Sequence, residues 1–472
     1  MCERLLANKA NVNKASKDGY SPLYIACREG RTSMCALLID KKADVNQELM
    51  DSVFPLYIAC GKGHVDVCEL LIANKANVFQ EDVDGYSPLY IACKHGHADV
   101  CELLIGSNAD VTHEDLDGFS PLFISCETGH ADVCELLLAN KADVDEADTS
   151  DVSPLFFACR DGHRDVCEVL LANKADVNKP DTADHSPVLI ASQKGFTDVC
   201  ELLLLNKADI NQPETDGYSP LLAICQKGDA DMCEFLLVHK ADVNQANKNG
   251  SSPLYIACNY GHANLCEVLL AHKADIDQTS MGAVSPLLIA GGKGHADVCE
   301  CLLTNKADVN QANRNGSSPL VFASENGHSN VCELLLANKA NVNQAMANGA
   351  SPLFMASLKG HKNTCEVLVA KKADVDQATA DGYSPLFFAC LQGNVNMCEL
   401  LCAFKADVNQ AAKDGTSPLC SACQDGNANM CALLLANKAD INQTMADGRN
   451  PLTIARRKGH KDVYELLLSN KP

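Results

Sequence analysis

The sequence lacks any apolar run that approaches the roughly 18 residues of a membrane-spanning helix. Its first residues, MCERLLANKANVNK, carry charges where a signal peptide needs an apolar core, and residue 2 is cysteine where myristoylation needs glycine. The final residues, SNKP, do not form a prenylation signal. These absences argue against membrane insertion and lipid anchoring, and they predict a cytoplasmic protein, with the nucleus as the alternative.

Positive charge is also scarce. The chain has 39 lysines and arginines against 61 aspartates and glutamates, which gives a net charge of −22 and an isoelectric point near 5.0. The excess negative charge is spread along the chain. Because such a surface repels phosphate backbones and anionic membranes, we expect neither nucleic acid nor a membrane surface as a partner.

Insertions and deletions are absent from the pattern that dominates the chain. Fourteen of the 17 prolines stand 33 residues apart, from Pro22 to Pro451, and a glycine follows each of them eight residues later, from Gly30 to Gly459. We number the unit from 1 to 33 with Asp18 at position 1, so the proline takes position 5 and the glycine position 13. A fixed period of this length indicates a repeat array, which forms one elongated body whatever its length.

Residues 84–116 show what one unit builds. Ser87 before Pro88 is typical of a helix start, and Gly96 ends a first helix of barely two turns. Residues 98–105 predict a second helix with a broad apolar face. A polar loop then leads to the next unit. Because one unit cannot bury its own apolar face, the units must stack.

Four motifs recur in register: DGxSPLxxA at positions 1–9, GH at 13–14, LLL at 20–22 and ADVN at 26–29. Together they resemble the ankyrin repeat over essentially the whole chain. The resemblance implies an all-α ankyrin-repeat solenoid of fourteen units plus an N-terminal half unit. We expect a single domain over residues 1–472, with the half unit at 1–17, thirteen full units at 18–446 and a capping unit at 447–472.

Two positions depart from the family pattern. Where the family has Thr-Pro-Leu-His, this chain has Ser-Pro-Leu followed by tyrosine, phenylalanine or leucine. We therefore expect apolar contact in place of the inter-repeat hydrogen bond of that histidine. The glycine before Ala-Asp becomes lysine, as at Lys75 and Lys141. A left-handed helix cap disfavours residues other than glycine. Either the lysine or the preceding residue, such as Asn140, takes that conformation.

Polar residues also occupy normally buried positions near both ends of the chain. Arg4 holds position 20, Arg456, Arg457 and Lys458 hold positions 10–12, and Tyr464 replaces cysteine at position 18. Such substitutions are typical of capping units. We therefore expect a complete protein or domain, and the alternative is a fragment of a longer protein.

The chain has 26 cysteines, fourteen at position 18 and nine at position 10. Equivalent positions of stacked repeats lie roughly 8–10 Å apart, whereas a disulfide needs Cα atoms closer than about 7 Å. We therefore expect reduced cysteines packed in the core. Cys420 and Cys423 form the one CxxC pair that the repeat pattern does not explain. A thiol redox or metal-binding role at this pair is a further hypothesis for the function.

Catalytic constellations are normally unique in a chain, whereas the polar residues here recur in most units. The nine histidines at position 14, such as His97, are interpreted as ordered turn residues. We therefore expect no enzyme, cofactor, metal or small-molecule substrate. The resemblance also makes the position-29 asparagines, such as Asn211 and Asn310, candidate substrates of an asparagine hydroxylase.

The resemblance implies that partner proteins bind on the concave side, through loop tips and first helices. Positions 3 and 11 vary freely between units, which fits either binding or simple solvation, and the tips of the first half are acidic. A basic and apolar partner segment would suit the Tyr86–Phe119 end. The candidate binding residues are Tyr20, Arg28, Asp82, Tyr86, Lys94, His95, Asp115, Phe119, Glu127, Arg160, Tyr218, Tyr260 and Tyr383.

The function expected from these observations is that of a non-catalytic, monomeric scaffold for protein–protein interaction. The alternative is a recognition module of a larger protein, such as a channel or a ubiquitin-ligase subunit, whose active domain lies outside this sequence.

Overall fold

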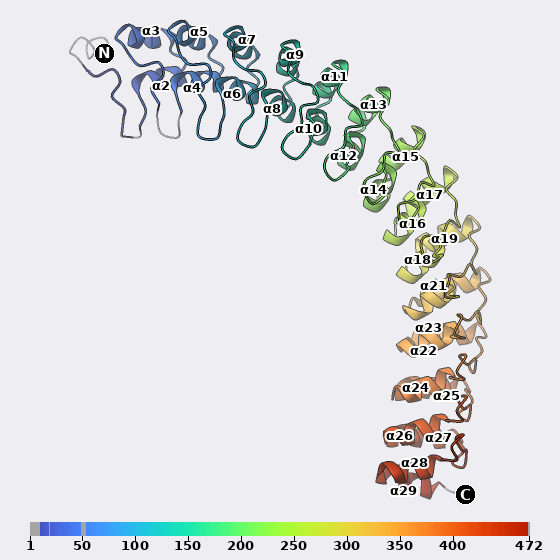
Figure 1. The fold of residues 1–472 in the computed structure, drawn as a ribbon. Coiled ribbons are helices and arrows are strands. Elements are labelled where there is room, and N and C mark those ends of the chain that lie inside the picture. The colour runs from blue at the N-terminus through green and yellow to red at the C-terminus, as the bar shows by residue number, and fades with distance from the viewer. Residues whose placement is uncertain (1–9, 18, 49–52, 471–472) are drawn as a thin grey trace. The chain divides into compact units, whose positions relative to one another are not determined.

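The computed structural model describes residues 10–17, 19–48 and 53–470, which form helices and contain no β-strand. Figure 1 shows the helices in chain order, two in each repeat. The first helices of the repeats are α2 (Pro22–Arg28), α4 (Pro55–Gly61), α6 (Pro88–Lys94), α8 (Pro121–Thr128), α10 (Pro154–Asp161), α12 (Pro187–Lys194), α14 (Pro220–Lys227), α16 (Pro253–Tyr260), α18 (Pro286–Lys293), α20 (Pro319–Glu325), α22 (Pro352–Lys359), α24 (Pro385–Leu391), α26 (Pro418–Asp425) and α28 (Pro451–Lys458). The second helices are α3 (Thr32–Asp40), α5 (Val65–Ala73), α7 (Ala98–Gly106), α9 (Ala131–Ala139), α11 (Arg164–Ala172), α13 (Thr197–Leu205), α15 (Ala230–Val238), α17 (Ala263–Ala271), α19 (Ala296–Thr304), α21 (Ser329–Ala337), α23 (Lys362–Ala370), α25 (Val395–Ala403), α27 (Ala428–Ala436) and α29 (Lys461–Ser469).

The chain divides into two compact units. One comprises Met1–Ala223 with Val238–Ala241, and the other comprises Ile224–Leu237 with Asp242–Pro472. Each unit is built from the same helix–turn–helix repeat, so the predicted all-α repeat fold is confirmed. The organisation of residues 1–472 as a single domain stays a prediction.

The Ser-Pro start of each first helix acts as the sequence predicts. The Oγ atom of Ser87 accepts a hydrogen bond from the backbone N–H of Tyr90 at 3.1 Å, and Pro88 takes the first turn, where no N–H donor is needed. The glycine at position 13 closes the helix in the left-handed conformation, as at Gly129, whose φ is +83°. These short helices are therefore fixed at both ends by local chemistry.

The core runs along each stack as a repeated set of buried side chains. In the third repeat, Leu89, Cys93, Val100, Cys101 and Leu104 are each at most 1% exposed. First helices contact first helices of neighbouring repeats, as α4 does α6, and second helices contact second helices, as α5 does α7. Since full burial of one leucine contributes about 1.5–3 kcal/mol, each helix depends on its neighbours for its stability.

The lysine at position 25 takes the left-handed conformation, which resolves the alternative left open by the sequence. Twelve lysines at this position have φ between +66° and +72°, whereas the preceding residue keeps a negative φ, as Asn140 does with φ −96°. The amide of Asn140 donates to the carbonyl of Leu136 at 2.9 Å and so completes the helix end. The lysine therefore carries the backbone strain.

Replacing Lys141 with glycine is expected to raise the free energy of unfolding by about 0.5–1 kcal/mol, because relief of the left-handed strain exceeds the entropy that glycine adds to the unfolded chain. Urea denaturation would measure the gain. Lys62 is the matched control, since its φ is −103° and Lys62→Gly relieves no such strain. A gain of equal size in both variants would contradict the explanation.

The polar residues near the C-terminus lie at the surface. Arg456, Arg457 and Lys458 are exposed, and Tyr464 is half-buried. Arg4 lies outside the described residues.

Candidate partner-binding surface

The side chain at position 32 holds the turn in the loops between repeats. The Oδ1 atom of Asp82 accepts hydrogen bonds from the backbone N–H groups of Asp84 and Tyr86 at 3.0 and 2.9 Å. Asp115 holds the next loop in the same way and is only 8% exposed. Asp115, which the sequence predicts as a contact residue, therefore uses its carboxylate in its own turn, and its role in binding stays a prediction. Half-buried Asp82 has the same turn-forming role.

The aromatic residues at position 3 stack on the residue four positions later. The rings of Tyr86 and Tyr90 lie 4.6 Å apart with 2° between their planes, and Phe119 stacks on Phe123 at 4.6 Å. The same pairing joins Tyr20 to Tyr24 and Tyr383 to Phe387. Position 7 makes apolar contact within its own repeat at these pairs, but Tyr90 also hydrogen-bonds to Asp115, so apolar contact does not simply replace a hydrogen bond there. Each position-3 ring keeps a solvent-facing part, because the four are half-buried or, for Tyr20, 38% exposed.

The surroundings of Tyr90 and His95 shift the pKa of each side chain toward its uncharged form. Burial, and then hydrogen bonding to Asp115, raise the pKa of the Tyr90 phenol. Partial burial, and then the neighbouring His97, lower the pKa of His95. Both side chains are therefore uncharged at neutral pH, and the charge of this region comes from its carboxylates and from cations at position 11.

Two of the cations at position 11 lie over aromatic rings. The Nζ atom of Lys94 is 5.1 Å from the ring centre of Tyr86. The guanidinium of Arg160 lies 4.2 Å from the ring centre of Phe157, and it pairs with Glu127 of the preceding repeat at 3.2 Å. The structure thus brings together two predicted residues, Glu127 and Arg160, that stand 33 residues apart.

The other predicted residues lie further along the array. Arg28 is exposed and pairs with Glu29 at 3.1 Å. Tyr218 is half-buried, and Tyr260 is 46% exposed at the end of α16. Tyr260 and Tyr383 belong to the second compact unit, whereas the remaining predicted residues belong to the first.

The histidines at position 14 link neighbouring repeats, which the sequence did not reveal. The Nε2–H of His97 donates to the carbonyl of Gly61, in the preceding repeat, at 3.3 Å, and eight of the nine histidines make the equivalent bond. Each ring also covers a position-13 glycine: a Cβ atom on Gly96 would lie 2.4 Å from His130. Glycine is therefore required there for its missing side chain as well as for its φ.

A second set of hydrogen bonds joins the repeats at positions 29 and 30. The Oδ1 atom of Asn310 accepts from the backbone N–H of Asn341 at 2.8 Å, and the amide of Gln344 donates to the carbonyl of Asn310 at 3.0 Å. Ten position-29 side chains, counting Asn13, accept in this way. The recurring Asn/Asp-Gln pair was the sequence signal for this ladder.

Comparison with protein families agrees with this geometry. The family model described as ankyrin repeats (3 copies) matches residues 48–115, 105–181, 188–280, 281–346, 337–412 and 404–472, and ankyrin repeats (many copies) matches residues 1–39. The chain belongs to the ankyrin repeat family. This family is generally non-catalytic, and its repeats are modules for protein–protein interaction.

Among solved structures, this ankyrin repeat chain is similar to the crystal structure of the human ASB11 ankyrin repeat domain. The two are 29% identical, the match covers 47% of this chain and 99% of that one, and the TM-score is 0.44. A search of curated proteins finds no match.

The cysteines form contacts within most ankyrin repeats that the comparison of equivalent positions did not predict. Cys93 Sγ lies 3.6 Å from Cys101 Sγ, so position 10 meets position 18 of the same repeat. Serine replaces the first cysteine in three repeats and keeps the contact, as Ser192 does with Cys200 at 3.5 Å. Position 10 therefore supplies a small, weakly polar group, and the packing does not depend on a second thiol.

The CxxC pair does not have the geometry of a redox centre. Cys423 contacts Cys431 at 3.8 Å, and Cys420 is fully buried with its backbone N–H bonded to Ser417. Burial raises the pKa of the Cys420 thiol, whereas a reactive thiol needs a lowered pKa. Within the described residues, no group of three or more potential ligands is placed to hold a metal ion, and no helix has the length and apolarity of a membrane span.

Alkylation of the native protein with iodoacetamide is expected to modify Cys301 and Cys402 first, since these are the half-buried cysteines of the described residues. Burial raises the pKa of both thiols to about 11, so their rates should rise about tenfold per pH unit below that value. Cys35 and Cys420 are 0% exposed and should be equally protected. Faster modification of Cys420 than of Cys35 would support the hypothesis of a redox role for the CxxC pair.

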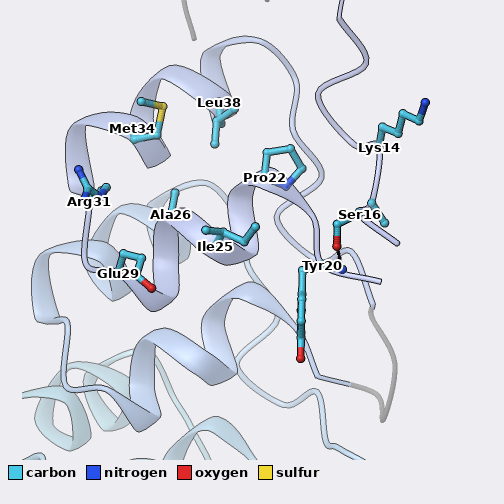
Figure 2. A pocket seen from close by; sticks show the side chains of 11 residues that line it. Lys14, Ser16, Tyr20, Pro22, Ile25, Ala26, Glu29, Arg31, Met34 and Leu38 are labelled. Carbon is cyan, nitrogen blue, oxygen red and sulfur yellow. Dashed lines mark hydrogen bonds between the residues drawn. The ribbon is translucent and has the colours of Figure 1, made fainter. Parts of the chain in front are cut away.

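The outer face of α2 carries a pocket of about 560 Å³, lined chiefly by Tyr20, Pro22, Ile25, Met34 and Leu38 (Figure 2). Ile25 is 39% exposed. The equivalent residue of α6, Ile91, is 8% exposed, because α6 packs against the preceding first helix, α4. The pocket is thus the position that the first helix of a preceding repeat occupies elsewhere.

Proposed function

We propose that this chain is a non-catalytic scaffold that binds partner proteins along the side formed by its first helices and loop tips, which is the concave side in the ankyrin family. The observation that carries the proposal is the set of partly exposed aromatic and cationic side chains on that side. Positions 3 and 11, which hold Tyr86, Phe119 and Arg160, carry different residues in different repeats. The glutamate at position 19, on the second helices, recurs in most repeats.

Fixed geometry supports this function. The ring of Tyr86 is held between Tyr90 and Lys94, and Arg160 is held by Phe157, Glu127 and Asp161. Side chains that are ordered before binding lose little conformational entropy on binding. Aromatic and arginine side chains also contribute most to interface affinity.

The remaining features of the proposal follow from charge and cysteine chemistry. The net charge of −22 favours protein partners over nucleic acid and anionic membranes. Closely packed thiols suit a reducing compartment, and we place the protein in the cytoplasm as a monomer. A recognition module within a larger protein would use the same surface.

Site-specific crosslinking tests the proposed side. A photoreactive residue at position Tyr86 should crosslink partner proteins in cells, whereas the same residue at exposed Glu102, on the second helix of the same repeat, should not. Mass spectrometry identifies the products. Equal crosslinking at both positions, or partners captured only at Glu102, would overturn the assignment of the binding side.

A further inference from the structure

Two neighbouring loops expose large apolar side chains at their tips. Val83, in the loop between α5 and α6, is 57% exposed, and Leu116, in the loop between α7 and α8, is 76% exposed. The two tips are in contact, because the N–H of Leu116 donates to the carbonyl of Asp84 at 3.3 Å. A Cβ atom on Gly85 would lie 3.3 Å from Leu116 Cγ. Exposed apolar groups on neighbouring loops mark interaction sites more often than isolated ones do.

Carboxylates surround this apolar pair. Glu81 and Asp84 are exposed on the first loop, and Glu114 and Asp117 are exposed on the second. Within residues 76–87 and 109–120, the sequence has one basic side chain, His113. Its Nε2 atom lies 3.1 Å from the carboxylate of Glu81. We call Val83, Asp84, Leu116 and Asp117 the tip strip. It presents two apolar and two anionic side chains on adjacent turns.

The backbone beneath the tip strip is fixed. Asp82 and Asp115 hold the two turns by their paired hydrogen bonds, and Tyr86 and Phe119 continue each turn into a stacked aromatic pair. The strip therefore does not have to fold when a ligand arrives.

The same two loops lack a residue that stabilises other loops. Position 29 is Phe79 in the first loop and Thr112 in the second, where ten other units have an asparagine or aspartate that accepts a hydrogen bond from the next repeat. The ring of Phe79 has no such acceptor and is 57% exposed. The absence of a stabilising residue beside an exposed apolar pair is what a surface adapted to a ligand would show.

We propose that the tip strip binds a short cationic and aliphatic segment of a partner protein, with its aliphatic side chains on Val83 and Leu116 and its lysines or arginines on Asp84 and Asp117. Stacked repeats lie roughly 9–10 Å apart. A polyproline II segment rises about 3.1 Å per residue with three residues per turn, so aliphatic residues three apart lie on one face and would reach both tips. This inference rests on the proposed function and names the partner chemistry for one part of that surface.

The test uses the full chain and a fluorescent ten-residue peptide with leucine at every third position and lysine at the others, with fluorescence anisotropy as the readout. Val83→Ser with Leu116→Ser should weaken binding about tenfold, since central apolar contacts dominate affinity. Asp84→Asn with Asp117→Asn should weaken it about threefold or more at low salt and less at high salt. All four side chains are exposed, so circular dichroism should show unchanged helix content.

Matched controls separate the strip from general attraction to an acidic chain. Glu69→Gln with Glu102→Gln removes the same charge from exposed sites on α5 and α7 of the same two repeats. Leu205→Ser with Val238→Ser removes exposed apolar groups elsewhere. Both controls should change affinity less than about twofold.

Two outcomes would overturn the tip-strip proposal: strip variants that bind like the parent chain, or controls that lose as much affinity as the strip variants. Crosslinking at Tyr86 distinguishes this failure from failure of the proposed function. Partners captured at Tyr86 but insensitive to the strip variants would leave the binding side in place and remove only the tip strip.

Discussion

Replacing Gly261 with alanine is expected to lower the free energy of unfolding by about 2–5 kcal/mol. Gly261 has φ +81°, a conformation that costs an L-residue about 1–2 kcal/mol. The new Cβ atom would also lie 2.7 Å from Nδ1 of His295. Moving that ring would break its 3.2 Å hydrogen bond to the carbonyl of Asn259 and strain the packing, for a further cost of about 1–3 kcal/mol.

Gly360→Ala is the matched control, because Gly360 has φ +79° and its nearest neighbour is Nδ2 of Asn394 at 3.7 Å. This variant carries only the backbone cost of about 1–2 kcal/mol. Repeat arrays need not unfold as one unit, so urea denaturation should be combined with hydrogen exchange in α16 to α19. Equal losses in the two variants would show that the histidine contact contributes nothing.

These histidine contacts show where the sequence was insufficient. The histidine and the glycine were both visible at fixed positions, and their local roles in the turn were predicted. The acceptor of His97, however, is the carbonyl of Gly61 in another repeat, 36 residues away. A repeating sequence states which residues recur, but it does not state which copy each one contacts. That information comes only from the packing of one repeat on the next.

Local chemistry, by contrast, was sufficient for the repeat fold. The Ser-Pro pair and the position-13 glycine specify where each first helix begins and ends, and the apolar pattern specifies the second helix. The left-handed cap was undetermined because asparagine and lysine both stood at the helix end. The structure places Lys141 there since the amide of Asn140 is used within the helix.

The candidate binding residues stay a prediction, but the structure shows how exposed each of them is. Tyr86 and Phe119 are partly exposed, as a binding role requires, whereas Asp115 is buried in its turn. An aspartate in a loop suits both roles, because its carboxylate can cap backbone N–H groups or face solvent. In the second unit, Asn247 holds the equivalent turn without a charge, so Asp82→Asn should keep the loop and remove only its charge.

Replacing Phe123 with alanine is expected to lower the free energy of unfolding by about 3–5 kcal/mol. Phe123 is 1% exposed, and its ring lies 4.6 Å from Phe119 and 4.4 Å from Phe157 of the next repeat. The loss of this ring removes contacts both between α8 and the loop that precedes it and between α8 and α10. Chemical denaturation would measure the change.

Phe123→Leu separates the aromatic contact from simple burial, because leucine fills the same repeat position, fully buried, at Leu189 and Leu288. This variant should cost less than about 1.5 kcal/mol. Phe119, however, stacks on Phe123 and follows the tip strip directly, so the leucine variant should also weaken binding of the lysine–leucine peptide while the fold persists. An affinity unchanged in Phe123→Leu would mean that the tip strip is held by its turns alone, without the aromatic pairs beneath it.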